Sequence, residues 1–106
     1  MATLSVVIAQ TYNPKRGYRD PVPAATPFAA EKITTSGTSQ KSTIGSTGVY
    51  GAFGSYWILT ASGGDMWVKF GTDPTAAAGS QWLILDGQTR EFAVDADAQK
   101  VAVIDA

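Results

Sequence analysis

The strongest strand signal in the chain lies in the stretch SYWILTASGGDMWVKF, residues 55–70. Its two ends, residues 55–61 and 66–70, are rich in aromatic and β-branched side chains, which favour β-strands. The Gly-Gly-Asp sequence at 63–65 is typical of a turn, so the stretch predicts a β-hairpin. No part of the chain shows the 3.6-residue periodicity of an amphipathic helix of ordinary length.

Three more strands are expected downstream, at residues 81–85, 89–94 and 100–104. They are short runs of apolar and β-branched side chains bounded by polar residues. The Asp-Gly pair at 86–87 separates the first two runs and is typical of a two-residue hairpin turn.

Upstream, residues 3–9 alternate so that Leu4, Val6 and Ile8 fall on one face of a strand. The whole chain then holds seven or eight short strands with turn signals between them. This pattern is typical of an antiparallel sandwich or a small barrel. We therefore expect a single all-β domain of the antiparallel β-sandwich or jelly-roll type.

A proline-rich segment, residues 10–30, holds four of the five prolines in the chain. Because proline fixes φ and restrains the residue before it, the segment is expected to be extended or turning. It is either an arm that lies along another molecule or a long loop folded onto its own domain. We expect an N-terminal strand and extended arm over residues 1–30 and a β-sandwich domain over residues 31–106. The arm residues expected to contact a partner are Tyr12, Lys15, Arg16, Tyr18 and Arg19.

The 106 residues include no cysteine and no histidine. This excludes thiolate and imidazole chemistry, and with it haem ligation, structural zinc and Cys- or His-based nucleophilic catalysis. The closely spaced carboxylates of Asp95 and Asp97 lack the ligand spacing of a calcium loop. We expect no catalytic residues, no metal site and no cofactor.

The net charge of −1 hides an asymmetry between the two halves of the chain. Residues 1–53 hold five basic and two acidic side chains, net +3, whereas residues 54–106 hold three basic and seven acidic ones, net −4. The opposite charges either assist head-to-tail contact between copies or reflect chance clustering on a solvated surface. Because phosphate binding needs a basic surplus, nucleic acid is not expected as a partner.

The longest N-terminal apolar run is far too short to span a bilayer, so no membrane partner is expected. Three tryptophans, Trp57, Trp67 and Trp82, lie in predicted strands. Such residues form either a hydrophobic core or an aromatic platform for a partner or a glycan. Alternation places Met66, Val68 and Phe70 on one face and Trp67 with Lys69 on the other, so Trp67 is expected either at an interface or under the proline-rich segment.

The C-terminal half resembles small virion structural proteins of tailed bacteriophages and prophages. The resemblance rests on WVKFG at 67–71, Pro74, LILDGQ at 83–88, EFAV at 91–94 and KVAVI at 100–104. It covers roughly residues 56–106, or about half of the chain. It implies a non-enzymatic β-sandwich or jelly-roll that assembles in many copies on a phage head or tail.

From this resemblance we expect a capsid decoration (cement) or head-fibre subunit that binds the assembled head and stabilises it. Its location would be the virion, assembled in the host cytoplasm. The expected partners are the major capsid protein or other virion proteins, and further copies of the chain in a symmetric oligomer such as a trimer. Two alternatives stay open: a tail-associated virion protein, and a carbohydrate-binding β-sandwich module. A host glycan is a candidate ligand in either setting.

Overall fold

The computed structural model describes residues 2–12, 22–23, 27–46, 55–79 and 81–106. Within this part of the chain there are strands, turns and loops but no helix, and hence no helix long and apolar enough to cross a membrane. The strands are β1 (Thr3–Tyr12), β2 (Val22–Pro23), β3 (Ala29–Thr34), β4 (Gln40–Lys41), β5 (Ser55–Ser62), β6 (Met66–Gly71), β7 (Trp82–Ile84), β8 (Thr89–Ala93) and β9 (Lys100–Asp105).

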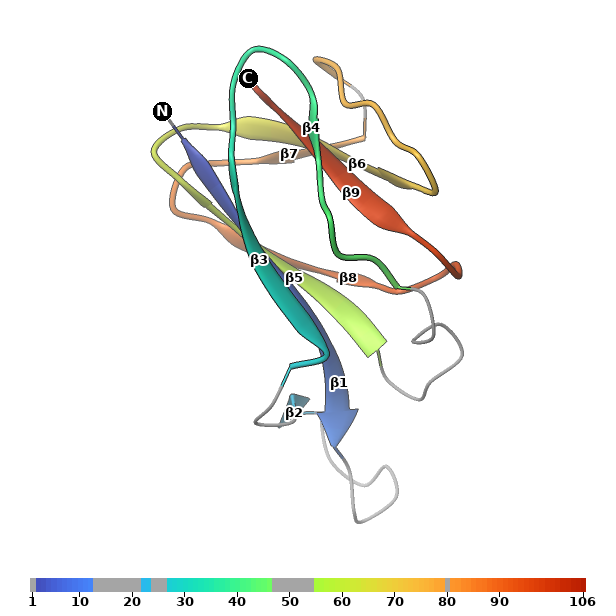
Figure 1. Cartoon of the computed structure of the whole chain (residues 1–106). Helices are drawn as coiled ribbons and strands as arrows, with labels where there is room; N and C mark the ends of the chain where they lie inside the picture. Colours follow the sequence, from blue (N-terminus) through green and yellow to red (C-terminus); the bar gives the residue numbers. More distant parts are fainter. Residues whose placement is uncertain (1, 13–21, 24–26, 47–54, 80) are drawn as a thin grey trace.

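These strands form two sheets (Figure 1). In the first sheet the order is β2-β1-β5-β8, and β3 also pairs with β1. In the second sheet the order is β4-β9-β6-β7. The strand pairs in the described part of the chain are antiparallel. The predicted all-β class with antiparallel pairing is therefore confirmed.

One hydrophobic core is built from the alternate positions that both sheets turn inward. In β1 the side chains of Leu4, Val6 and Ile8 are fully buried, as their alternation predicts. Each such side chain stabilises the fold by roughly 1.5–3 kcal/mol relative to full exposure. The core residues from both sheets are Leu4, Val6, Ile8, Ile33, Trp57, Leu59, Ala61, Met66, Val68, Ile84, Val101 and Val103.

The predicted hairpin over residues 55–70 is wrong, although both of its strands are present. β5 pairs with β1 and β8, whereas β6 pairs with β9 and β7 in the other sheet. Both hydrogen-bonding edges of β5 are occupied, so no edge is left for β6. The connection at 63–65 therefore carries the chain from one sheet to the other, and Gly63 supports this turn with a φ of 95°.

The second predicted hairpin, around Asp86 and Gly87, is wrong in the same way. A tight turn is present, since the Gln88 N–H donates to the Leu85 carbonyl at 2.9 Å and Gly87 has a φ of 80°. However, β7 belongs to the second sheet and β8 to the first. The Asp86-Gly87 pair thus forms the expected turn, but a tight turn does not by itself decide whether the flanking strands pair.

The start of the chain is part of the first sheet rather than separate from it. β1 lies between β3 and β5, and it shares a core with residues from the second sheet. β2 pairs back onto the end of β1, with Val22 opposite Tyr12 and Pro23 opposite Thr11. Tyr12 is the last residue of β1. The other four residues expected to contact a partner from the arm (Lys15, Arg16, Tyr18 and Arg19) lie outside the described residues.

Candidate binding site

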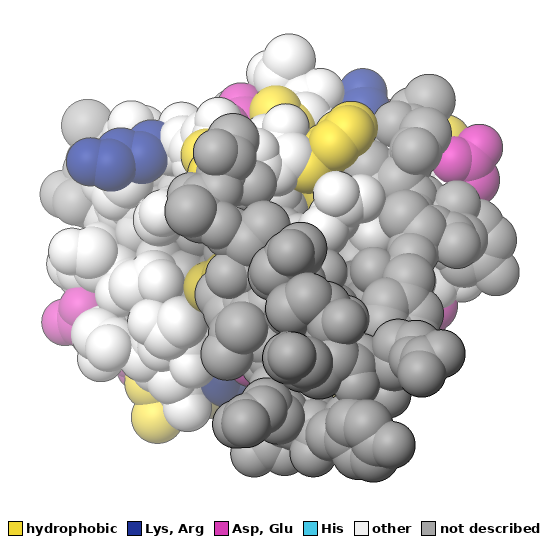
Figure 2. Space-filling view, turned by 90° about the horizontal axis from the view of Figure 1, so that it is seen from below, with side chains coloured by type: hydrophobic (Ala, Val, Ile, Leu, Met, Phe, Trp, Pro, Cys, Tyr) yellow, Lys and Arg dark blue, Asp and Glu magenta, His cyan; other side chains and the backbone are white. Residues whose placement is uncertain are grey.

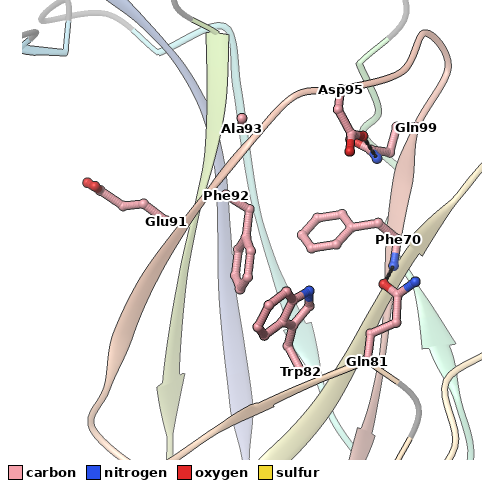
Figure 3. A pocket seen from close by; sticks show the side chains of 8 residues that line it. All are labelled: Phe70, Gln81, Trp82, Glu91, Phe92, Ala93, Asp95 and Gln99. Carbon is pink, nitrogen blue, oxygen red and sulfur yellow. Dashed lines mark hydrogen bonds between the residues drawn. The ribbon is translucent and has the colours of Figure 1, made fainter.

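A hollow of about 730 Å³ opens at the edge of the molecule where β7 of one sheet lies near β8 of the other. We call it the edge hollow. Figure 3 shows three aromatic side chains, Phe70, Trp82 and Phe92, that point toward one another inside it. Polar side chains lie at its two ends, with Asp95 and Gln99 at one end and Gln81 at the other.

The strand register explains why these rings meet. Phe92 of β8 lies opposite the buried Trp57 of β5, so its ring points between the sheets. Trp82 of β7 lies opposite the buried Val68 of β6, so it too points inward, but from the edge of its sheet. Phe70 follows Val68 by two residues on the same face of β6.

Four rings form a continuous series, the aromatic row, from the core to the surface. The ring centroids of Trp57 and Phe70 are 5.4 Å apart, those of Phe70 and Phe92 5.2 Å, and those of Phe92 and Trp82 5.5 Å. All three pairs are tilted, a geometry that aromatic rings favour over face-to-face stacking. Trp57 is fully buried at the inner end, whereas Trp82 is 46% exposed at the outer end.

Arg90 holds the outer end of the aromatic row in place. Its guanidinium carbon lies 5.6 Å from the ring centroids of both Trp82 and Phe92, within the range of a cation–π contact. The guanidinium also donates to the Leu83 carbonyl at 3.4 Å. Arg90 thus ties β8 to β7 across the mouth between the two sheets.

Gln99 organises the polar end nearer the core. Its side-chain oxygen accepts a hydrogen bond from the Trp57 indole N–H at 3.0 Å, and its side-chain nitrogen donates to Asp95 Oδ1 at 2.7 Å. Its backbone is bound as well, because the Gln99 N–H donates to Ser46 Oγ at 2.8 Å. The residue before it, Ala98, has a φ of 54°, a left-handed conformation that a non-glycine residue adopts at a cost. The buried amide therefore has a fixed orientation.

Gln81 marks the opposite end of the edge hollow. Its side-chain oxygen accepts the Phe70 backbone N–H at 2.9 Å, which ties the residue before β7 to β6. Glu91 and Ala93 also border the edge hollow, but β8 alternates, and Figure 3 shows the Glu91 carboxylate pointing away from the rings. Phe92 is therefore the residue of this triplet that faces the interior.

Two described side chains outside the aromatic row, Tyr56 and Asp73, have shifted pKa values. The pKa of the Tyr56 phenol lies above its ordinary value, because burial disfavours the phenolate and the Glu91 carboxylate repels it. The pKa of the Asp73 carboxyl lies below its ordinary value, because Lys41 donates a hydrogen bond to it and attracts its charge. At neutral pH Tyr56 is thus neutral and Asp73 ionised, so neither provides a group poised for acid–base chemistry.

The three tryptophans predicted as interface or glycan residues have different positions. Trp57 is a core residue with no exposed surface, so its assignment as a contact residue is corrected. Trp67 is half-buried on the outer face of the second sheet, where it lies opposite Leu83 and Ile104. Trp82 is the one of the three that lines the edge hollow.

Sequence reasoning missed Arg90 and Gln99. Alternation within TREFA at 89–93 already places Arg90 on the same face as Phe92, so this signal was available. Gln99 carries no such signal, because its role depends on Trp57, which is 42 residues away in the chain.

The described residues include no group of three or more Asp or Glu side chains that could hold a metal ion. On the face seen in Figure 2, basic and acidic side chains of the described residues are scattered rather than gathered into one charged patch. Among the described residues, the edge hollow, with its aromatic rings and fixed polar ends, is the candidate site for binding a ligand.

No family model matches the chain, and the comparisons with curated proteins and with solved structures found no similar protein.

Proposed function

We propose that the chain is a non-enzymatic virion structural protein of a tailed bacteriophage or prophage. In this proposal it is a capsid decoration (cement) or head-fibre subunit that binds the assembled head and stabilises it. The observation that carries the proposal is the order and spacing of WVKFG, Pro74, LILDGQ, EFAV and KVAVI within residues 67–104. The structure assigns these pieces to β6–β9 and the turns beside them, so they belong to one folded unit.

The proposed fold type is a β-sandwich of the jelly-roll kind. Its support is the pair of antiparallel sheets with one shared core. Five connections, those after β3, β4, β5, β7 and β8, join strands of different sheets rather than neighbours in one sheet. Such a path is typical of two-layer β folds in which strands are not simple successive hairpins.

The proposed partners are the major capsid protein or other virion proteins, together with further copies of the chain in a symmetric oligomer such as a trimer. An apolar row across the outer face of the second sheet supports assembly. There Leu83, Trp67 and Ile104 are opposite one another in register, and each is only half-buried. A tryptophan in such a row is a typical anchor of protein interfaces.

In this proposal the segment at 10–30 attaches the protein to the head through its basic residues. Lys15, Arg16 and Arg19 lie in the half of the chain with net charge +3, whereas the other half carries −4. An acidic surface on a neighbouring subunit would therefore attract this segment. Because β1 is central in the first sheet, deletion of residues 1–30 would remove core residues and could not test the segment alone.

Charge reversal provides the sharper experiment. We expect the triple variant Lys15→Glu, Arg16→Glu, Arg19→Glu to lose most of its co-sedimentation with purified heads that lack this protein, because attraction to an acidic neighbour becomes repulsion. The matched control reverses Lys32, Lys69 and Lys100 and changes the net charge equally. Circular dichroism checks that both variants fold. Equal binding by wild type and by the first variant would overturn the attachment role.

Two alternative functions remain. A tail-associated virion protein would have the same inert β fold, and imaging of labelled virions separates head from tail. A carbohydrate-binding β-sandwich module is favoured by one observation, the partly exposed Trp82 in the edge hollow.

A further inference from the structure

We propose that the edge hollow is a binding site for a neutral saccharide, with Trp82 as the stacking surface and Asp95 and Gln81 as polar contacts at its two ends. The proposal concerns the isolated chain and holds whether or not the chain is part of a virion. It follows from the rings, the polar atoms and the charges around this hollow.

The first step is the aromatic surface. A pyranose ring presents C–H groups that pack well on the face of an indole, and Trp82 keeps 46% of its surface exposed. This indole is already oriented by Phe92, 5.5 Å away, and by the Arg90 guanidinium, 5.6 Å from its ring centroid. A surface fixed before the ligand arrives loses little entropy on binding, which favours affinity.

The second step is the polar ends. Sugar hydroxyls both donate and accept hydrogen bonds, and carboxylates and amides match them. Gln99 uses one oxygen of Asp95 and holds that carboxylate at one end of the edge hollow. At the other end Phe70 holds the amide of Gln81 through its backbone N–H. The edge hollow therefore has aromatic rings in the middle and a fixed polar group at each end. This arrangement suits a small ligand that has apolar faces and polar edges.

The third step is the charge of the ligand. The Asp95 carboxylate lies at one end of the hollow and disfavours an anionic sugar or a phosphate there, whereas the Glu91 carboxylate points away from the rings (Figure 3). The Arg90 guanidinium keeps its positive charge in its cation–π contacts with Trp82 and Phe92, and this charge disfavours a cationic ligand. The two opposite charges near the rings leave no net charge that would select an ion of either sign. A neutral ligand is left.

The volume of the hollow agrees with this class of ligand. At about 730 Å³ it falls within the range of ligand sites, which is roughly 300–1,000 Å³. It is open at the β7–β8 edge, so a sugar unit can enter while the rest of a longer chain stays outside.

The test is a nuclear magnetic resonance titration of the full chain with cellohexaose, maltohexaose and fully N-acetylated chitohexaose as neutral probes. Hexagalacturonate serves as the anionic probe and choline as the cationic one. We expect at least one neutral probe to shift the indole N–H signal of Trp82 and to leave that of Trp67 unchanged. Trp82→Ala should weaken binding of that probe at least tenfold, about 1.4 kcal/mol, and Asp95→Asn should weaken it as well.

Controls separate loss of the site from loss of the fold. Phe28→Ala removes another exposed aromatic side chain, outside the edge hollow, and should leave saccharide affinity unchanged. Trp82→Phe keeps a stacking surface and should retain part of the affinity. Absence of binding by all three neutral probes at millimolar concentration would overturn the proposal, as would preferred binding of hexagalacturonate or choline, or loss of binding in the Phe28 variant. Binding to purified heads is a separate measurement, so a failure there leaves this result intact.

Discussion

At the scale of single residues, the contact between Trp57 and Gln99 joins the core to the edge hollow. The Trp57 indole N–H is buried and donates to the Gln99 side chain at 3.0 Å. A buried donor without an acceptor costs free energy, because it has lost its hydrogen bonds to water. Gln99 is 42 residues from Trp57 in the chain, yet its side chain accepts the hydrogen bond of the largest side chain in the core.

Replacement of this amide should destabilise the protein. We expect Gln99→Leu to lower the free energy of unfolding by about 1–3 kcal/mol, because the Trp57 N–H keeps its burial and loses its acceptor. Urea unfolding followed by circular dichroism measures the change. Gln40→Leu, at an exposed position in β4, is the matched control and should change stability by less than about 0.5 kcal/mol.

A second background tests the physical reason. In the Trp57→Phe variant there is no indole N–H to satisfy, so the Gln99→Leu change should cost less there than in the wild type. An equal cost in both backgrounds would assign the effect to another contact of Gln99.

Sequence patterns predicted burial at the residue scale better than they predicted exposure. Alternation identified Leu4, Val6 and Ile8 as one buried face, because period 2 is a local property of a strand. It could not separate Trp57 from Trp82, since both lie on inward-facing positions. Trp57 is in a strand flanked on both sides, whereas Trp82 is in an edge strand, and that difference depends on sheet order.

At the scale of elements, the two tight connections between the sheets contact each other. The Gly63 N–H donates to Asp86 Oδ1 at 2.8 Å, and the Asp86 N–H donates to Asp65 Oδ1 at 2.8 Å. The Gly87 N–H also donates to the Ala61 carbonyl at 2.9 Å. The connection after β5 and the connection after β7 therefore stabilise each other at one end of the two sheets.

The turn at Gly87 should be sensitive to backbone strain alone. Its φ of 80° is in the left-handed region, and a Cβ added there would meet no atom within 4 Å. We expect Gly87→Ala to cost about 1–2 kcal/mol of stability through conformation rather than through a clash. Gly87→Asn should cost less, because asparagine tolerates this conformation. Thermal and urea unfolding measure both.

Gly37→Ala is the control for this turn, because it also has open space around the new Cβ but no left-handed φ. It should be neutral, or stabilising by about 0.4–1 kcal/mol through a less flexible unfolded chain. A loss at Gly37 as large as that at Gly87 would contradict the explanation from backbone strain.

The positions of the strands were largely predictable from sequence, and their pairing was not. The strands expected at 55–61, 66–70 and 100–104 all exist, because strand propensity and alternation are local. The two expected hairpins do not form. The partners of β5 are β1 and β8. Strands β2 to β4 separate β1 from β5 in the chain, and strands β6 and β7 separate β5 from β8. A local turn signal cannot specify such distant partners.

At the scale of the whole molecule, the two sheets share one core but leave one side open. The edge hollow exists because neither β7 nor β8 has a further strand beside it among the described residues. Its ring content could be expected from the aromatic strand residues, whereas its location required the sheet order. The two functional proposals depend on different evidence. The virion proposal rests on sequence motifs, whereas the saccharide site rests on side chains that only the folded structure brings together.

The path of the chain between the sheets also has a kinetic consequence. β1 pairs with β5, and Thr3 lies opposite Ser62. β1 therefore lacks one of its neighbouring strands until more than half of the chain is available. Such a pairing closes a long loop, and the entropy lost on closure opposes folding until the contacts of the pair have formed. This high contact order should make refolding slow for a domain of this size, in the range of milliseconds to seconds.

Stopped-flow fluorescence can measure that rate in a Trp67→Phe, Trp82→Phe background, where Trp57 is the single remaining tryptophan. Its ring becomes buried only when β1, β8 and the second sheet are in place, so its signal reports completion of the core. Complete recovery within microseconds would contradict this expectation. During synthesis, the same delay leaves the apolar face of β1 exposed until its distant partners emerge.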